Sequence, residues 1–183
     1  MSRIEIPATV EDAPDASQPL LRQVEKQLGS APNLFRLAAK SPAALEGYLG
    51  LSGALGKGRL PAATRERVAL AIAEFNGCGY CLSAHTYVGS KLAGLDAAEI
   101  AANRAGRSND ARADAAVCFA LRVAETRGHV ADAHLQAVRD GGYDDAQIIE
   151  LVQHVALNVW TKYLNEVART DIDFPAVAVT RAA

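Results

Sequence analysis

The sequence of 183 residues contains few aromatic residues and no excess of charge of one sign. Aromatic residues account for only 5% of the chain, and because aromatic side chains favour strands, their scarcity argues against a β-rich fold. The 19 basic and 21 acidic residues leave a formal net charge of −2, which attracts neither phosphate backbones nor anionic lipids over long range. We therefore exclude nucleic acid and membrane as the main partners.

The sequence also lacks long apolar runs and an even number of cysteines. Residues 1–7 contain an early acid and no apolar segment of a signal peptide, and no interior stretch is uncharged over the length of a bilayer. We expect a cytoplasmic protein. The three cysteines are an odd number, and without a secretion signal they do not indicate a framework of structural disulfides.

Alanine is abundant, with 37 of the 183 residues. Because alanine has the highest helix propensity, this composition predicts an all-α fold. The length fits one domain with a substantial core. Residues 1–16, with two prolines and several acids, are expected to form an extended N-terminal arm, and residues 17–183 a single helical domain.

Capping residues, glycines and apolar periodicity divide this domain into helices. Asp96–Glu99 and Asp144–Gln147 have the spacing of capping boxes, and no segment shows a convincing strand pattern. The expected helices cover residues 17–29, a short stretch from 31, 42–56, 62–76, 82–92, a short stretch from 97, 110–128, 131–139 and 146–170.

A pair of cysteines, Cys78 and Cys81, lies at a glycine-marked break between two of the expected helices. Both sulfur atoms should therefore lie in or beside the first turn of the second helix. Free N–H groups and the helix dipole stabilise a thiolate at such a position. Since the two side chains are three residues apart, they are close enough for a disulfide to form and break without unfolding the helix. The spacing allows reversible oxidation.

His85 follows Cys81 by four residues, which is one helical turn along the same face. Its imidazole could accept a proton from the thiol or stabilise the thiolate. Glu66 lies on the preceding helix, which should fold back beside the cysteine helix, so its carboxylate could orient His85. Glu74 is nearer to the cysteines in the sequence and is the alternative candidate for this carboxylate.

The spacing of these four residues carries a resemblance. The sequence has Glu66, then eleven residues, then Cys78-x-x-Cys81, then three residues and His85. This arrangement resembles the core motif of alkylhydroperoxidase D-like proteins in the carboxymuconolactone decarboxylase superfamily. The likeness extends over roughly residues 31–175 and implies an all-α helical bundle with the Cys-x-x-Cys at the N-terminus of a core helix. Tyr80 departs from the pattern, since alkylhydroperoxidase D has a second histidine there.

The resemblance implies a thiol-dependent peroxidase that reduces hydroperoxides. Cys81 would be the peroxidatic thiolate, Cys78 the resolving cysteine, and His85 with Glu66 the proton relay. It implies no bound cofactor and no metal, and electrons from an external dithiol such as a lipoyl group or a thioredoxin-like protein. Members of the family form trimers or hexamers, so a homo-oligomer is expected.

Other interpretations of the same residues remain. Cys78, Cys81, His85 and Glu66 could together bind zinc, although no second ligand pair is present in the sequence. A decarboxylase-type lyase could use His85 and Glu66 as acid and base, and a non-catalytic redox-sensing module or an interaction protein with inert cysteines is also possible.

Two residues outside the motif also carry expectations. Cys118, between apolar neighbours on an alanine-rich helix, is expected to be a small buried core residue. His154 lies among apolar residues of the last helix and is either a core histidine with its hydrogen bonds satisfied or part of a pocket wall.

Overall fold

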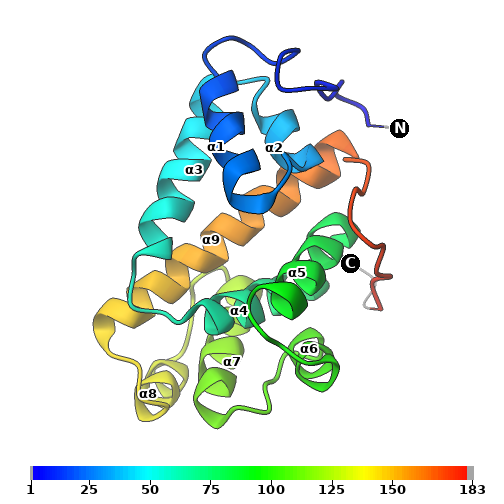
Figure 1. Cartoon of the computed structure of the whole chain (residues 1–183). Helices are drawn as coiled ribbons and strands as arrows, with labels where there is room; N and C mark the ends of the chain where they lie inside the picture. Colours follow the sequence, from blue (N-terminus) through cyan, green and yellow to red (C-terminus); the bar gives the residue numbers. More distant parts are fainter. Residues whose placement is uncertain (1, 181–183) are drawn as a thin grey trace.

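The structure is a computed structural model that describes residues 2–180, and within them it contains nine helices and no strand (Figure 1). The predicted all-α fold is confirmed. The helices are α1 (Gln18–Leu28), α2 (Asn33–Ala38), α3 (Pro42–Gly56), α4 (Ala62–Phe75), α5 (Gly79–Lys91), α6 (Ala97–Arg104), α7 (Ala111–Thr126), α8 (Asp132–Asp140) and α9 (Asp145–Ala168).

Helix α4 is the helix around which the others are arranged. It packs against α5, α6, α7 and α9, and a continuous run from Val68 to Glu74 is buried. A helix buried on all sides belongs in the interior of a domain. Alanines at positions 69, 71 and 73 let neighbouring helices approach closely. As a result, α4 fixes the positions of α5 and α9 relative to each other.

The helices form two groups on either side of α9 (Figure 1). Helices α1, α2 and α3 surround one apolar cluster, which also includes Val10 and Ala13 of the N-terminal arm. Helices α4, α7, α8 and α9 enclose a second cluster, and a third lies around α4, α5 and the C-terminal segment. The long helix α9 therefore contributes to the boundary between the two groups.

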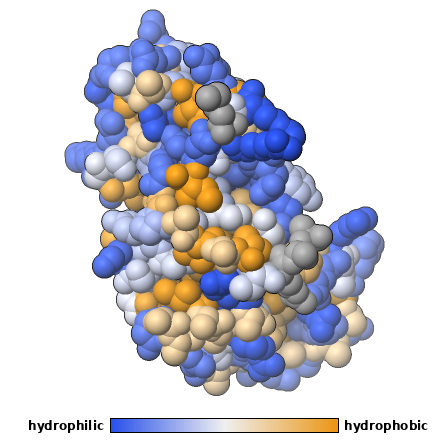
Figure 2. Space-filling view, turned by 90° about the vertical axis from the view of Figure 1, so that its right-hand side faces the viewer, coloured by the Kyte–Doolittle hydropathy of each residue, from blue (hydrophilic) through white to orange (hydrophobic). Residues whose placement is uncertain are grey.

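The segment after α9, residues 170–180, lies across the start of α5. The Val177 N–H donates to Ser83 Oγ at 3.0 Å, and the Thr180 N–H donates to a carboxylate oxygen of Glu74 at 2.7 Å. Phe174 packs edge-on against the ring of Tyr80. Figure 2, which faces the side with the C-terminal segment, shows hydrophobic residues gathered across its middle and lower half. Residues 181–183 of the expected domain lie outside the described residues.

Most helix ends follow the predicted capping residues. Asp144 accepts from the Gln147 N–H at 3.0 Å, and the Gln147 side chain accepts from the Asp144 N–H, so this capping box is complete. The box expected at Asp96 is only half formed. Asp96 accepts from the Glu99 N–H at 2.7 Å, but the Glu99 side chain turns inward instead of back to the cap.

Two further expectations from the sequence need correction. Helix α5 begins at Gly79, three residues before the expected start, because Cys78 itself acts as the N-cap. Cys118 is only partly buried, since α7 turns this side chain toward a loop, where its thiol lies 3.8 Å from the Gly106 carbonyl oxygen and 3.8 Å from Asp114. Among residues 2–180, no helix has the length and apolar character of a membrane span.

Glu99 joins α4, α6 and the loop before α7 through a buried hydrogen-bond network. Its carboxylate accepts from Arg67 Nε at 2.6 Å, Ser108 Oγ at 2.5 Å, Asn103 Nδ2 at 3.0 Å and the Asn109 N–H at 2.8 Å. Burial alone raises a carboxyl pKa, but these donors outweigh it and lower the pKa of Glu99 to about 2. The charged form therefore stabilises the fold.

Replacing Glu99 tests this network. We expect Glu99→Gln to lower the free energy of unfolding at pH 7 by about 2 kcal/mol, because the amide cannot accept from all four donors. Since the pKa is lowered in the folded state, this stabilisation is present above the ordinary pKa of 4.5 and is lost as the pH falls toward 2. Urea unfolding at pH 7 and pH 3 measures both effects.

The matched control for this prediction is Glu125→Gln, which removes a surface ion pair with Arg122 at 2.8 Å. It should change the free energy of unfolding by less than about 0.5 kcal/mol. Equal effects of the two substitutions would contradict a stabilising role of the Glu99 network.

Candidate active site

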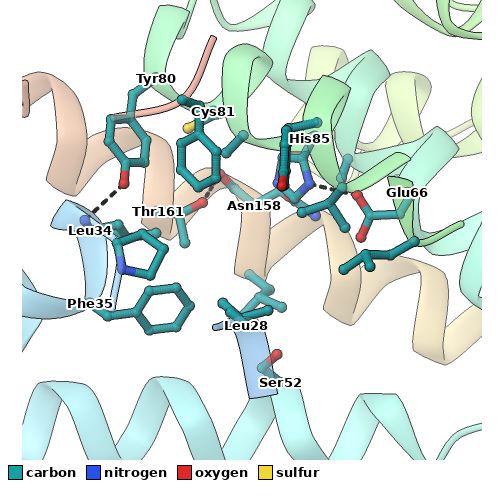
Figure 3. Close-up of a pocket in the computed structure, with 18 of the residues that line it drawn as sticks. Leu28, Leu34, Phe35, Ser52, Glu66, Tyr80, Cys81, His85, Asn158 and Thr161 are labelled. Carbon is teal, nitrogen blue, oxygen red and sulfur yellow. Dashed lines mark hydrogen bonds and ion pairs between the residues drawn. The ribbon is translucent and has the colours of Figure 1, made fainter. Parts of the chain in front are cut away.

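A cavity of about 580 Å³ lies between α5 and the group formed by α1, α2 and α3 (Figure 3). Helices α4 and α9 and the C-terminal segment complete its wall. Its volume is within the range of sites that bind small organic molecules. The aromatic side chains that line it are Phe35, Tyr48, Tyr80, Tyr87 and Phe174.

The two cysteines of the motif lie at the N-terminus of α5 and differ in access to the cavity. Cys78 is the N-cap, where its sulfur accepts from the Cys81 N–H at 3.2 Å. Cys81 lines the cavity and is 6% exposed, whereas Cys78 is fully buried behind it and is not part of the lining. Both are free thiols. A molecule in the cavity would therefore meet the sulfur of Cys81 first.

The surroundings of Cys81 favour its thiolate. The Cys78 thiol donates a hydrogen bond to the Cys81 sulfur, and this bond outweighs burial and lowers the pKa of Cys81 to about 7. Asn165 Nδ2, 3.5 Å from the sulfur, and the charge of His85 act in the same direction. The same bond, together with burial, raises the pKa of Cys78. The thiolate is thus favoured at Cys81 and the protonated thiol at Cys78.

His85 and Glu66 meet as the spacing predicted. Nδ1 of His85 lies 2.9 Å from Oε2 of Glu66, which α4 presents from the side (Figure 3). Burial alone lowers the pKa of His85, but the Glu66 carboxylate and the nearby Cys81 thiolate outweigh it and raise the pKa. Asn158 adds a hydrogen bond in the same direction. The Glu66 carboxylate therefore favours the protonated imidazole of His85 beside the cavity.

Glu74, the alternative carboxylate, is engaged elsewhere. It is 1% exposed and accepts from Arg104 Nε at 2.8 Å and from Thr180. It therefore anchors α6 and the C-terminal segment to α4. Of the two candidates, Glu66 is the one that contacts His85.

The wall of the cavity that faces the cysteines comes from α9, and of its polar residues only His154 was considered as a pocket residue from the sequence; it does line the cavity. Four buried polar residues on α9, spaced by four, three and four positions, form this wall: His154, Asn158, Thr161 and Asn165. Asn165 Nδ2 donates to the Cys81 sulfur at 3.5 Å, and the Thr161 hydroxyl donates to the Asn158 carbonyl oxygen at 3.0 Å. Thr161 also acts to lower the pKa of Cys81, and Asn158 to raise that of His85. Their recurrence at helical spacing along one face of α9 is a sequence signal that could have revealed this polar stripe.

Tyr80, the departure from the family motif, ties the cysteine helix to two other segments. Its hydroxyl accepts from the Leu34 N–H at 3.0 Å and donates to Asp173 at 2.9 Å (Figure 3). Asp173 in turn accepts from the Asn33 N–H at 2.7 Å. Burial raises the pKa of Tyr80, so its hydroxyl keeps its proton. Tyr80 therefore stabilises the cavity wall.

The structure also bears on the zinc interpretation. Within residues 2–180, no three side chains of His, Cys, Asp or Glu are grouped so that they could hold a metal ion. His85 Nδ1 already contacts Glu66, and Cys78 faces the Cys81 N–H.

Comparison with known proteins agrees with the motif. Residues 42–126 match the model of the carboxymuconolactone decarboxylase family. This part of the chain is similar to that family. The match covers α3 to α7 and includes Glu66, Cys78, Cys81 and His85. The family resemblance seen in the sequence is therefore confirmed. A search of curated proteins gives no match.

Solved structures of this fold extend the likeness over almost the whole chain. The alkylhydroperoxidase AhpD core, an uncharacterized peroxidase-related protein from Ralstonia eutropha JMP134, superposes with a TM-score of 0.84 at 21% identity, over 94% of this chain and 92% of that one. A peroxidase-related protein from Silicibacter sp. TM1040 gives 0.79 at 21% identity, with 93% and 91% covered. The expected AhpD-like bundle is confirmed as the fold.

A third similar structure is the debrominase Bmp8. It superposes with a TM-score of 0.77 at 21% identity, over 92% of this chain and 91% of that one. A cysteine-to-alanine variant of Bmp8 has been solved in complex with 2,3,4-tribromopyrrole. The fold is therefore shared by proteins described with different activities.

The unequal surroundings of the two thiols can be tested by alkylation. We expect iodoacetamide to modify Cys81 first, with a rate that rises with pH around a midpoint of about 7, because only the thiolate reacts. Cys78→Ala removes the donor and should move this midpoint toward the ordinary value of 9.0. Mass spectrometry of tryptic peptides, with Cys118 as the internal reference, identifies the site. Preferential modification of Cys118 or Cys78 would contradict the assignment.

Proposed function

We propose that this protein is a thiol-dependent peroxidase that reduces hydroperoxides through Cys81 and Cys78. The observation that carries the proposal is the difference between the two thiols: the one favoured as a thiolate lines the cavity, and its protonated partner is buried directly behind it. The family match and the peroxidase-related proteins of the same fold support this choice.

The reaction follows from these positions. The Cys81 thiolate attacks the outer oxygen of a hydroperoxide, the O–O bond breaks, and Cys81 becomes a sulfenic acid while an alkoxide leaves. His85, held by Glu66, protonates the alkoxide to an alcohol. Cys78 then attacks the sulfenic sulfur, and a disulfide and water form. Each turnover oxidises the two thiols by two electrons and reduces one peroxide bond.

An external dithiol must reduce the disulfide for a second turnover. Because Cys78 is fully buried, the reductant would attack Cys81 from the cavity. A lipoyl group or a thioredoxin-like protein remains the proposed donor. The proposed assembly is a homo-oligomer, a trimer or hexamer. Supporting it, α9 presents exposed apolar side chains at Ile149, Tyr163 and Val167.

Cysteine variants test the proposed chemistry. We expect Cys81→Ser to abolish consumption of cumene hydroperoxide in the presence of dithiothreitol, and Cys78→Ser to leave a sulfenic acid on Cys81 that dimedone traps. Cys118→Ser is the matched control and should behave like the parent, since Cys118 lies outside the cavity lining. Parental consumption by the Cys81 variant would refute the proposal.

Further measurements on the same protein distinguish the other interpretations. A lyase that uses His85 and Glu66 would keep its activity after both thiols are alkylated. A redox-sensing module would form the disulfide without turnover with any dithiol. Dehalogenation, suggested by the debrominase of the same fold, would appear as bromide release from tribromopyrrole without consumption of hydroperoxide.

A second variant tests the proton relay. Glu66→Gln removes the charge that raises the pKa of His85, so the pKa should fall. We expect peroxide consumption at pH 7 to decrease about 10- to 100-fold. Because the acid form of His85 exists only below its pKa, the decline of activity at alkaline pH should begin at lower pH than in the parent.

The control for the relay is Glu46→Gln, on the exposed surface of α3. It should leave both the rate and the pH profile unchanged. If Glu66→Gln slows the reaction equally at every pH, Glu66 acts only as a structural partner of His85.

A further inference from the structure

The far end of the cavity, away from Cys81, contains a histidine with an unused nitrogen. His154 precedes Asn158 by four residues on α9, one turn along the polar stripe, and lines the cavity. It is 6% exposed, and its Nε2 has no hydrogen-bond partner among the described residues. Because buried polar atoms in folded proteins are normally hydrogen-bonded, such an atom needs an explanation.

Arg65 lies in the same part of the cavity wall and has no counter-ion. Its Nη1 donates to the Leu55 carbonyl oxygen at 2.9 Å, at the end of α3. No carboxylate in residues 2–180 forms an ion pair with it, and the neighbouring Glu66 contacts His85 instead. A partly buried guanidinium usually has an anionic partner, and its planar N–H groups match a carboxylate.

The positive charge of Arg65 acts on His154. Burial, and second the charge of Arg65, lower the pKa of His154 to about 4. The imidazole is therefore neutral at neutral pH and can donate a hydrogen bond from one ring nitrogen. An anion beside both residues would neutralise Arg65 and also satisfy Nε2.

The position of His154 relative to Cys81 defines the shape of a ligand. Thr161, which contacts Cys81, follows His154 by seven residues, about 10 Å along α9. The lining of the cavity also includes apolar and aromatic side chains such as Leu157, Phe35 and Tyr48. A molecule that reaches both ends needs an apolar body with one polar end.

We propose that Arg65 and His154 form a carboxylate-binding subsite, so that the cavity takes amphiphilic organic acids with the reacting end at Cys81. Only the statement that the reacting group is a hydroperoxide rests on the proposed function. The binding site itself does not depend on that chemistry. It predicts discrimination between an acid and the corresponding alcohol of equal chain length.

Binding of octanoate and 1-octanol by isothermal titration calorimetry at pH 7 tests the subsite. We expect octanoate to bind at least about tenfold more tightly, because only the carboxylate accepts charge-assisted hydrogen bonds from Arg65. Arg65→Met should bring octanoate to the affinity of octanol and leave octanol unchanged. The matched control is Arg59→Met, which removes a surface charge paired with Asp144 outside the cavity. It should leave both affinities unchanged.

Two variants test the contribution of His154. His154→Phe should weaken octanoate binding about tenfold, and His154→Gln, which can still donate a hydrogen bond, should restore it to within about threefold of the parent. The unaltered protein gives a second readout that does not require a variant to fold. Octanoate, but not octanol, should raise the pKa of His154 followed by NMR of its imidazole.

The outcomes separate this inference from the proposed function. Equal affinity for octanoate and octanol, or equal weakening by Arg65→Met and Arg59→Met, would overturn the subsite even in an active peroxidase. An unchanged His154 resonance on saturation with octanoate would also overturn it. Selective octanoate binding by a protein that consumes no hydroperoxide would support the subsite and refute only the peroxidase.

Discussion

The burial of α4 on every side is the constraint on which the site depends. From Val68 to Glu74 this helix has no exposed face, because other helices cover its apolar side chains on all sides. Two of the covering helices, α5 and α9, carry the cysteines and the polar stripe. Glu66 itself comes from α4. The same packing that builds the core therefore brings together groups that are far apart in the sequence.

The chemistry of the cysteine pair follows from one geometric difference between Cys78 and Cys81. Both thiols lie at the start of α5, where the helix dipole favours negative charge. Only Cys81 also meets the side chains of α9 and the cavity, so its thiolate gains hydrogen bonds that Cys78 does not have. Cys78 is used instead as cap and donor. Burial and hydrogen bonding thus make two identical side chains chemically different.

The sequence predicted the features that depend on local spacing. The helical content, most caps and the contact between His85 and Glu66 all follow from residues within or beside one helical turn, or from a short turn between two helices. It did not predict which face of α9 would line a cavity, because that depends on packing against α3 and α5. Cys118 was misjudged for the same reason, since alanine-rich sequence around it does not reveal which side of α7 is covered.

The C-terminal segment, residues 170–180, determines part of the shape of the pocket. Its backbone is fastened to Ser83 on α5 and to Glu74 on α4, and Phe174 forms part of the cavity wall. No residue of the segment itself belongs to the stretch that matches the family, residues 42–126. A chain shortened after α9 would keep every residue of the cysteine motif and yet lose one wall of its pocket. Changes in this segment could therefore alter what enters the pocket without changing Glu66, Cys78, Cys81 or His85.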